Sequence, residues 1–377
     1  MGILPSFFAV QVAFAPLPPN YISALRQIEI ESSIERASIF RLHFDLSRTW
    51  LGDWDLLQFD IFRPLVPIRI SVSFGLGLPQ TIINGYVRDS TVANSNDPGS
   101  STLDVVGLDA TATIMNHIQQ PMTWPNLPDS EVVRTIYGKY ALVPFVLPTP
   151  PMRTMADVTT TQRIPDIRYV KQLAERNAYE YYVQPDPIAG MDVGHFHPPQ
   201  TIMPPQGVLS VDLGIETNLL NFNVSNDSLQ PKTVVKASID PMTKAPIPAV
   251  APVPTEPPMG LEPTLARIIP PPVERSPASD AASPAEVQMR SQAEVNRAAR
   301  AIRGNGEIDT LKFARVLRPG LPVLVRGAGR QNSGLYYVNE VRHVISEDGY
   351  SQTFQCWRNA VGLTGAEVFI DPMAAVA

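Results

Sequence analysis

The sequence predicts a β-rich α+β protein in which a small α+β insert separates two all-β blocks, and a proline-rich excursion interrupts the second block. Three patterns lead to this prediction. Apolar and polar residues alternate before residue 116 and again after residue 207, as they do in half-buried strands. Apolar residues recur at helical spacing between residues 108 and 182. Thirteen of the 44 residues from 241 to 284 are proline, against 39 in the whole chain of 377.

The first β block is assigned to residues 1–118. Apolar side chains alternate with polar ones over residues 40–46 and 68–74, and residues 81–92 and 103–108 are two further expected strands. Because these strands follow one another without helices between them, an antiparallel barrel or sandwich is favoured over an α/β fold.

The insert is assigned to residues 119–205 and should contain two helices, each followed by a strand. The first helix is expected over residues 130–140, with Asp129 as its N-cap and an apolar stripe of Val132, Val133, Ile136 and Tyr137. The second follows Pro165-Asp166, with Ile167, Val170, Leu173 and Ala174 on one face and Arg168, Lys171, Glu175 and Arg176 opposite. The strands are expected at 142–147 and 179–183.

The second β block begins at residues 206–240 and resumes at 307–365, followed by a tail at 366–377. The intervening residues 241–284 are expected to be extended, because proline lacks the amide donor that a sheet or helix needs. Four apolar residues there favour packing on a partner over a mobile linker: Leu261, Leu265, Ile268 and Ile269. A helix is expected at 285–306, begun by a capping box at Ser283–Glu286 and ended by Gly304-Asn305-Gly306.

Residues 318–358 predict an antiparallel meander of three strands. The first contains Val323 and Val325. The second and third are marked by a larger set of alternating residues: Leu335, Tyr337, Val338 and Val341, then Tyr350, Thr353 and Phe354. Glycine-bearing turns separate the strands, where positive φ is tolerated.

The same region resembles the C-terminal signature of the phage late control D family. The motif runs Pro319-Gly320, Gly327-Ala328-Gly329, Ser333-Gly334-x-Tyr336-x-Val338-x-x-Val341-x-His343 and Gly349-Tyr350. Members are tail hub proteins of contractile phages and phage-like injection particles, and relatives of the base of type VI secretion spikes. The insert and the passage from Leu219-Leu220-x-Phe222 to Asp240-Pro241 resemble the family as well.

The resemblance implies two tube-like antiparallel β-barrel domains per chain and a homotrimer of pseudo-sixfold symmetry. Such a ring is a structural baseplate hub that adapts the sixfold inner tube to a threefold spike. The implied partners are a spike protein trimer, inner tube proteins and other baseplate components. Because no long β-helix follows residue 377, the spike is expected to be a separate polypeptide, unlike the fused type VI arrangement. Assembly in the bacterial cytoplasm and a final place in a virion tail or injection particle are implied too.

Charge and cysteine content narrow the possible functions. Thirty Lys and Arg stand against 36 Asp and Glu, a formal net charge of −6, so no nucleic-acid binding is expected beyond passage through a channel. Cys356 is the chain's single cysteine, so no intrachain disulfide or cysteine-based metal site can form, and a buried thiol is expected. The apolar N-terminus lacks basic residues and contains three prolines, so neither a signal peptide nor a membrane segment is predicted.

The sequence predicts no enzyme, and no catalytic, metal or cofactor residue is assigned. Nucleophile-elbow, zinc-protease and phosphate-loop motifs are missing, and Gly327-x-Gly329 fits a hairpin turn. His43 is expected to face solvent or an interface. His195 and His197 could share a metal, but a structural or surface role is favoured.

Two other function classes stay open. A tail-associated peptidoglycan hydrolase could use paired acids such as Asp53 and Asp55. A carbohydrate-binding β protein would carry exposed aromatic platforms, whereas the four tryptophans are scattered along the chain. The residues that bind partners are not assigned.

Overall fold

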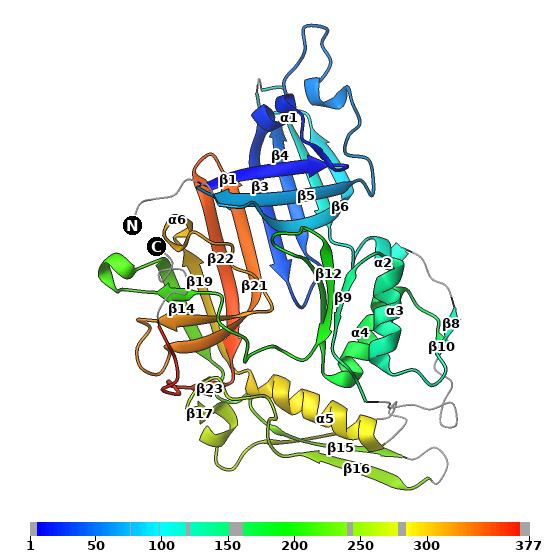
Figure 1. The fold of residues 1–377 in the computed structure, drawn as a ribbon, viewed down its shortest axis with the longest axis vertical. Helices are drawn as coiled ribbons and strands as arrows, with labels where there is room; N and C mark the ends of the chain where they lie inside the picture. The colour runs from blue at the N-terminus through cyan, green and yellow to red at the C-terminus, as the bar shows by residue number, and fades with distance from the viewer. Residues whose placement is uncertain are drawn as a thin grey trace.

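The protein is β-rich, with few helices and one large antiparallel sheet, in the computed structural model (Figure 1). The structure describes residues 6–75, 77–97, 99–117, 121–150, 161–239, 244–277 and 284–369. Strands from the first third of the chain form the upper part of the molecule in Figure 1. Strands from the last fifth form the central left part, and the insert lies to the right.

The large sheet contains 13 strands in the order β14-β19-β22-β21-β3-β4-β7-β6-β5-β1-β2, with β20 on β21 and β13 on β20. One half is built from the N-terminal strands β1 (Ser6–Val12), β2 (Ala15–Pro16), β3 (Leu25–Ser33), β4 (Ile39–Asp45), β5 (Pro67–Phe74), β6 (Gln80–Ala93) and β7 (Thr102–Leu108). The other half contains β13 (Val208–Ser210), β14 (Leu219–Asn226), β19 (Ile302–Ile308), β20 (Pro322–Arg326), β21 (Gly334–Ser346) and β22 (Gly349–Arg358).

Antiparallel pairing of β21 with β3 joins the two halves into one sheet. The long β21–β22 hairpin also belongs to both hydrophobic cores. Val341 and Phe354 pack in the core of the second half, whereas Ile345 and Tyr350, farther along the same two strands, pack in the core of the first half. The predicted meander is therefore confirmed, and it is the element that couples the two halves.

Period-two alternation sets which face of each strand is buried. Phe40, Leu42 and Phe44 of β4 are fully buried, as predicted, and the same alternation holds in β5. The two outermost strands of the second half approach one another as well. The Asn218 backbone N–H donates to Ser210 O at 3.1 Å, and the Asn218 side chain accepts from the Ser210 N–H at 2.7 Å.

The insert contains the two predicted helices, α3 (Asp129–Lys139) and α4 (Asp166–Asn177), beside a three-stranded sheet of order β11-β12-β9. Its remaining elements are β9 (Val143–Val146), β11 (Glu180–Pro185), β12 (Asp192–His197), the short pair β8 (Met122–Thr123) and β10 (Thr161–Gln162), and α2 (Ile114–His117).

Two details of the insert differ from the sequence prediction. Asp129 is the first helical residue, after Pro128 at the N-cap, and its carboxylate binds Arg176 and Asn177 instead of the helix amides. Arg176 was placed on the polar face of α4 but is 7% exposed. A buried ion pair between neighbouring helices removes both side chains from the surface, which helical spacing alone cannot indicate.

The proline-rich segment forms strands, contrary to the prediction that it cannot take part in a sheet. β16 (Pro246–Ala251) and β18 (Val273–Pro277) flank β15 (Thr233–Ile239), and α5 (Pro284–Ala299) packs on this sheet. Proline fits because an edge strand has one edge without ladder hydrogen bonds, where a missing N–H costs little. Of the four expected anchors, Leu265 is buried, whereas Leu261 and Ile269 are 74% and 91% exposed.

The boundary after α5 also differs from the prediction. The helix ends at Ala299, and Gly304 and Gly306 lie inside β19 instead of terminating a helix. A Cβ on Gly304 would lie 2.8 Å from the Cys356 Sγ and 2.9 Å from the Phe222 ring. These glycines therefore make room for core side chains. Ser283, the expected cap, lies outside the described residues.

Short elements complete the chain. They are α1 (Pro19–Ala24), η1 (Asp55–Leu57), η2 (Gly214–Glu216), β17 (Glu262–Pro263), η3 (Thr264–Arg267), α6 (Thr310–Phe313) and β23 (Ala360–Val361). Among the helices that the structure describes, none is both long and apolar enough to span a membrane.

Candidate functional site

The sheet presents a continuous polar face from β14 to β4. Side chains that alternate with the buried ones line a hollow of about 530 Å³ there. They include Asn221, Asn223, Asn305, Glu307, Thr353, Gln355, Glu340, Arg342, Glu29, Glu31 and Arg41. The strands are thus amphipathic, with their apolar sides in the two cores and their polar sides sharing one surface.

Charges on this face are largely paired with each other. Arg342 lies 3.0 Å from Glu29, and Arg36 lies 2.9 Å from Glu31 and 2.5 Å from Glu340. Arg342 and Glu340 lie on β21, and their partners lie on β3 or, for Arg36, in the connection between β3 and β4, so these two ion pairs cross the β21–β3 seam. Paired exposed charges contribute little stability, but they leave a surface without a strong field of one sign.

His43 lies on the same polar side, as expected. Its Nδ1 is 2.6 Å from the Asp104 carboxylate on the neighbouring strand β7. The two side chains are about 40–45% exposed, and no third ligand completes a metal site in the described parts of the chain.

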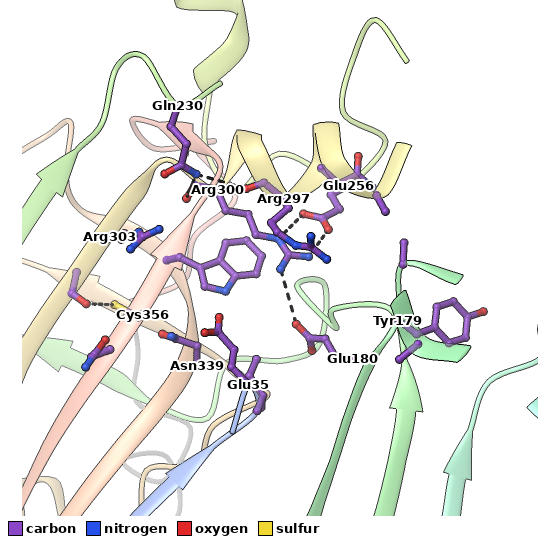
Figure 2. A pocket seen from close by; sticks show the side chains of 18 of the residues that line it. Glu35, Tyr179, Glu180, Gln230, Glu256, Arg297, Arg300, Arg303, Asn339 and Cys356 are labelled. Atoms are coloured by element: carbon purple, nitrogen blue, oxygen red, sulfur yellow. Dashed lines mark hydrogen bonds and ion pairs between the residues drawn. The ribbon is translucent and has the colours of Figure 1, made fainter. Parts of the chain in front are cut away.

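A second hollow, of about 760 Å³, lies where the insert, the proline-rich segment and the second half of the sheet meet (Figure 2). Its walls come from α4, β11, β14, α5, β19 and β22. Figure 2 shows Arg300, just after the end of α5, directed at Glu180 and Glu256, with Arg297 beside it and Arg303 lying apart. We call the cluster of Glu180, Glu256, Arg300, Tyr337 and Trp357 the junction.

Arg300 occupies the centre of the junction. Its guanidinium lies 2.5 Å from Glu256, 4.0 Å from Glu180 and 4.4 Å from the centre of the Trp357 ring. The side-chain amide of Gln230 donates to three carbonyls at the end of α5, including Arg300 O at 3.2 Å, and so satisfies groups that a helix end leaves free. One arginine thereby ties α5 to the proline-rich segment, β11 and β22.

Glu180 is the unusual acid of this cluster. One carboxylate oxygen accepts from the Tyr337 hydroxyl at 2.7 Å, whereas the other, Oε1, has no hydrogen-bond partner among the described residues. Burial raises the pKa of Glu180 to about 7, and the nearby Arg300 offsets only part of that shift. No pattern in the sequence indicated a role for Glu180, because its partners Arg300 and Tyr337 lie far away in the chain.

The junction should make stability depend on pH near neutrality. The folded-state pKa of Glu180, about 7, lies above the ordinary 4.5, so the folded protein keeps a proton that the unfolded chain releases. The stability that this proton contributes is fully present below about pH 4.5 and is lost as the pH rises through 7. We expect Glu180→Gln to remove roughly 3 kcal/mol of this pH dependence, measured as urea unfolding free energies from pH 4.5 to 8.

Glu175→Gln is the matched control for this measurement. Glu175 lies on α4, 59% exposed and 3.9 Å from Lys171, so its variant should follow the wild-type pH profile. If Glu180→Gln also ran parallel to wild type across this range, the elevated pKa would be wrong.

Arg318, from the Pro319-Gly320 region of the motif, is a second point where distant segments meet. It is 8% exposed and donates to Thr81 O at 2.6 Å and to Pro185 O at 3.3 Å. Burial lowers the pKa of Arg318 to about 10. Gly320 follows with φ of +82°, and a Cβ there would lie 2.3 Å from the Tyr182 hydroxyl, so this position requires glycine.

The two histidines at 195 and 197 lie on strand β12. His197 Nδ1 lies 2.8 Å from Pro198 O, which can only accept, so this nitrogen carries the proton. His197 Nε2 then accepts from His195 Nδ1 at 3.2 Å, and Tyr182 stacks on the His195 ring at 4.4 Å. A shared metal ion would need one free nitrogen lone pair from each ring directed at the same point. In this arrangement the two rings are hydrogen-bonded to each other instead, which supports the structural role.

Buried neutral histidines should make the protein sensitive to acid. Burial, with a smaller effect of His197, lowers the pKa of His195 to about 3, and burial, with Arg318, does the same for His343. The unfolded chain binds these protons near pH 6.5, so stability is complete above that pH and falls as the pH drops towards 3. We expect urea midpoints to fall from pH 6.5 to 4, and His343→Gln to reduce that dependence.

An equal pH slope for His343→Gln and wild type would contradict a buried neutral His343. Its Nδ1 lies 2.8 Å from the Tyr350 hydroxyl, and glutamine can accept the same hydrogen bond.

The remaining sequence candidates have local roles. Asp53 accepts from the Trp54 backbone amide, and Asp55 accepts from the amides of Leu56 and Ser47, so both carboxylates cap their own loop. Cys356 is buried as predicted, and burial raises the pKa of its thiol. Gly327 and Gly329 have positive φ in the connection between the antiparallel strands β20 and β21, which confirms the hairpin turn.

Solved structures with the same fold come from phage tails and secretion systems. The tail protein from Neisseria meningitidis MC58 is 12% identical, with a TM-score of 0.66 over 94% of this chain and 97% of that chain. The 43 kDa tail protein of prophage MuSo2 from Shewanella oneidensis is 12% identical, with a TM-score of 0.65 over 94% and 99%.

A third neighbour belongs to a secretion system. The E. coli c3393 protein, a type VI secretion component described as similar to the T4 bacteriophage tail proteins gp27 and gp5, has a TM-score of 0.57 at 12% identity, over 93% of this chain and 76% of that chain. No family model and no characterised protein sequence matches the chain. The similarity therefore rests on three-dimensional structure, and it establishes that this chain has the fold of phage tail proteins and of type VI secretion components.

Proposed function

We propose that this chain is the structural baseplate hub of a contractile phage tail or phage-like injection system. In this role it forms a homotrimeric ring, with the inner tube proteins on one side, a spike protein trimer on the other and further baseplate components around it. It is assembled in the bacterial cytoplasm and becomes part of a virion tail or injection particle. The shared fold of phage tail and type VI proteins supports this assignment.

One observation carries the proposal: strands of a single sheet contribute buried side chains to two separate hydrophobic cores. We assign one barrel domain to residues 1–118 and a second to 206–240 with 307–365. The insert at 119–205, the proline-rich segment at 241–284 and the helix region at 285–306 lie outside the barrels, before the tail at 366–377. The hydrogen bonds between Asn218 and Ser210 support closure of the second barrel. Two similar domains in each of three chains present six units to a sixfold tube and three to a spike.

The polar face is proposed to line the passage through this ring. Four carboxylates and two arginines line its hollow, and Arg36 pairs with two of the acids from the rim. A weakly acidic wall gives a phosphate backbone nothing to bind, and a wall without apolar patches does not retain a polypeptide. Molecules could then move through the passage without being held.

We propose no enzymatic activity. A peptidoglycan hydrolase would need acids held together at a site, and Asp53 and Asp55 are instead bound to loop amides. A carbohydrate-binding protein would need aromatic platforms. Trp50 is 91% exposed, but Trp124 and Trp357 are buried.

The test is the assembly state and partner of the purified chain. Light scattering coupled to size exclusion should give the mass of three chains, and negative-stain images should show a threefold ring with a central hole. The trimer should bind the purified spike encoded in the same gene cluster and should not clear a cell-wall suspension. A monomer at assembly concentrations, or turnover of peptidoglycan, would contradict the hub role.

A further inference from the structure

The eight-strand part of the sheet that carries the polar face ends in two open edges. At one end, β14 pairs with β19, and the described residues show no strand on its other side along residues 221–226. At the other end, residues 88–93 of β6 pair with β7, whereas β5 pairs only with the earlier part of β6. These two segments lie on opposite sides of the molecule (Figure 1).

Residues 88–93 of β6 are exposed on both faces, whereas in β14 Phe222 and Val224 are half-buried against the core. All six residues from 88 to 93 of β6 are exposed, including Val92 on the side that faces the core in β7. In β14, Leu220 is 62% exposed, and Asn221, Asn223, Ser225 and Asn226 are exposed as well. Unpaired backbone groups in such strands are templates for another strand.

Neither edge carries proline or lysine, two of the residues that most often prevent pairing, although the β6 segment begins with Arg88 and Asp89 beside a bulge. Residues 219–226, LLNFNVSN, and residues 88–93, RDSTVA, contain no proline and no lysine. The edge strand β16 offers a contrast within the same chain, because Pro246 and Pro248 interrupt its donors. Strand edges that stay free in solution are usually blocked in that way.

The strand directions also permit the two edges to meet. Every neighbouring pair from β14 through β19, β22, β21, β3, β4 and β7 to β6 is antiparallel. With eight strands alternating in direction, β14 and β6 run in opposite senses. The β14 edge of one chain can therefore pair antiparallel with the β6 edge of the next chain without reversing either.

The geometry points to head-to-tail pairing of β14 with residues 88–93 of β6 from a second copy of this chain, which rests on the proposed trimer. Asn223 and Thr91 lie on the polar side of their strands, since Thr91 is opposite Asp104 and Asn223 is opposite Asn305. Pairing in this way continues the polar face from one chain to the next. Because the two paired edges differ, the contact is heterologous. Successive copies therefore pair every edge only when the chains close into a ring.

Paired cysteines test this contact directly, since the native Cys356 is buried. One cysteine is placed in β14 at Asn221, Asn223 or Ser225 and one in β6 at Asp89, Thr91 or Ala93, so that nine double variants sample the possible registers. Under mild oxidation, at least one double variant should give a reducible band with the mass of three chains on a non-reducing gel. The corresponding single variants should give monomer bands. Asn223→Cys combined with Val250→Cys in β16, where Val250 is exposed as the test positions are, is the matched control and should not cross-link.

The outcomes separate this inference from the hub role. A chain that light scattering shows to be trimeric, but that cross-links in none of the nine variants, would overturn the edge pairing and leave the hub intact. Dimers from a β14 single variant would overturn it too, because they indicate two β14 strands face to face. A wild-type chain that stays monomeric would overturn both proposals.

Discussion

Replacing Arg358 with methionine is expected to destabilise the protein by about 3–5 kcal/mol, because several buried acceptors lose their donor together. Arg358 is fully buried near the end of β22. It donates to Ser333 O at 3.0 Å, to Met259 O at 2.9 Å and to Gly362 O at 2.8 Å. Its guanidinium also lies 5.1 Å from the centre of the Tyr336 ring. Methionine fills most of the volume but cannot donate.

Arg342→Met is the control for this prediction. Arg342 lies on the polar face in β21, where its side chain is 53% exposed and 3.0 Å from Glu29. An exposed pair contributes about 0–1 kcal/mol, so this variant should stay within 1 kcal/mol of wild type in urea unfolding. If the two arginine variants were equally stable, the three carbonyl contacts would have no energetic role.

The second large effect is expected at the ion pair between α3 and α4. Arg176 Nε donates to Asp129 Oδ2 at 2.8 Å, a second guanidinium nitrogen binds Oδ1, and the Asn177 amide donates to Oδ2 at 2.6 Å. Both charged side chains are 7% exposed as whole residues. Asp129→Leu leaves a buried cation without its partner, which costs about 3–5 kcal/mol.

A double variant separates this cause from simple packing loss. Asp129→Leu with Arg176→Met removes both charges, and apolar replacement of a whole buried pair is often neutral, so stability should largely return. Glu131→Leu, in the same turn but exposed and paired with Arg134, should have little effect. Hydrogen exchange should locate the loss in the single variant to α3 and α4. A double variant as unstable as the single one would show that the uncompensated charge is not the cause.

The junction and Arg318 explain how the insert and the proline-rich segment are held on the sheet. Arg300 reaches β11, β22 and the segment before β17, whereas Arg318 reaches β6 and β11. Both are cations buried among groups from distant parts of the chain. They fix where the insert and the proline-rich segment lie beside the polar face, which is the surface that the proposed ring would use.

Much of the fold could be predicted from alternation and helical spacing. The strands at 39–45, 67–74 and 334–358 follow patterns in which neighbouring residues decide their own exposure, so short windows of sequence suffice. The proline-rich segment was predicted incorrectly. Whether proline can enter a strand depends on which edge is paired, and the partner strand β15 lies outside that segment.

By itself the sequence determined the amphipathic strands, the two helices of the insert, the C-terminal meander and the buried Cys356. The tertiary structure alone decided that β3 meets β21, that Arg300 and Glu180 share a junction, and that two edges of the sheet stay open. The physical reason is how far apart in the chain the interacting residues lie. Alternation records how each residue partitions between water and core. The pairing of charges depends on segments as much as 321 residues apart, and their proximity leaves no periodic pattern in the sequence.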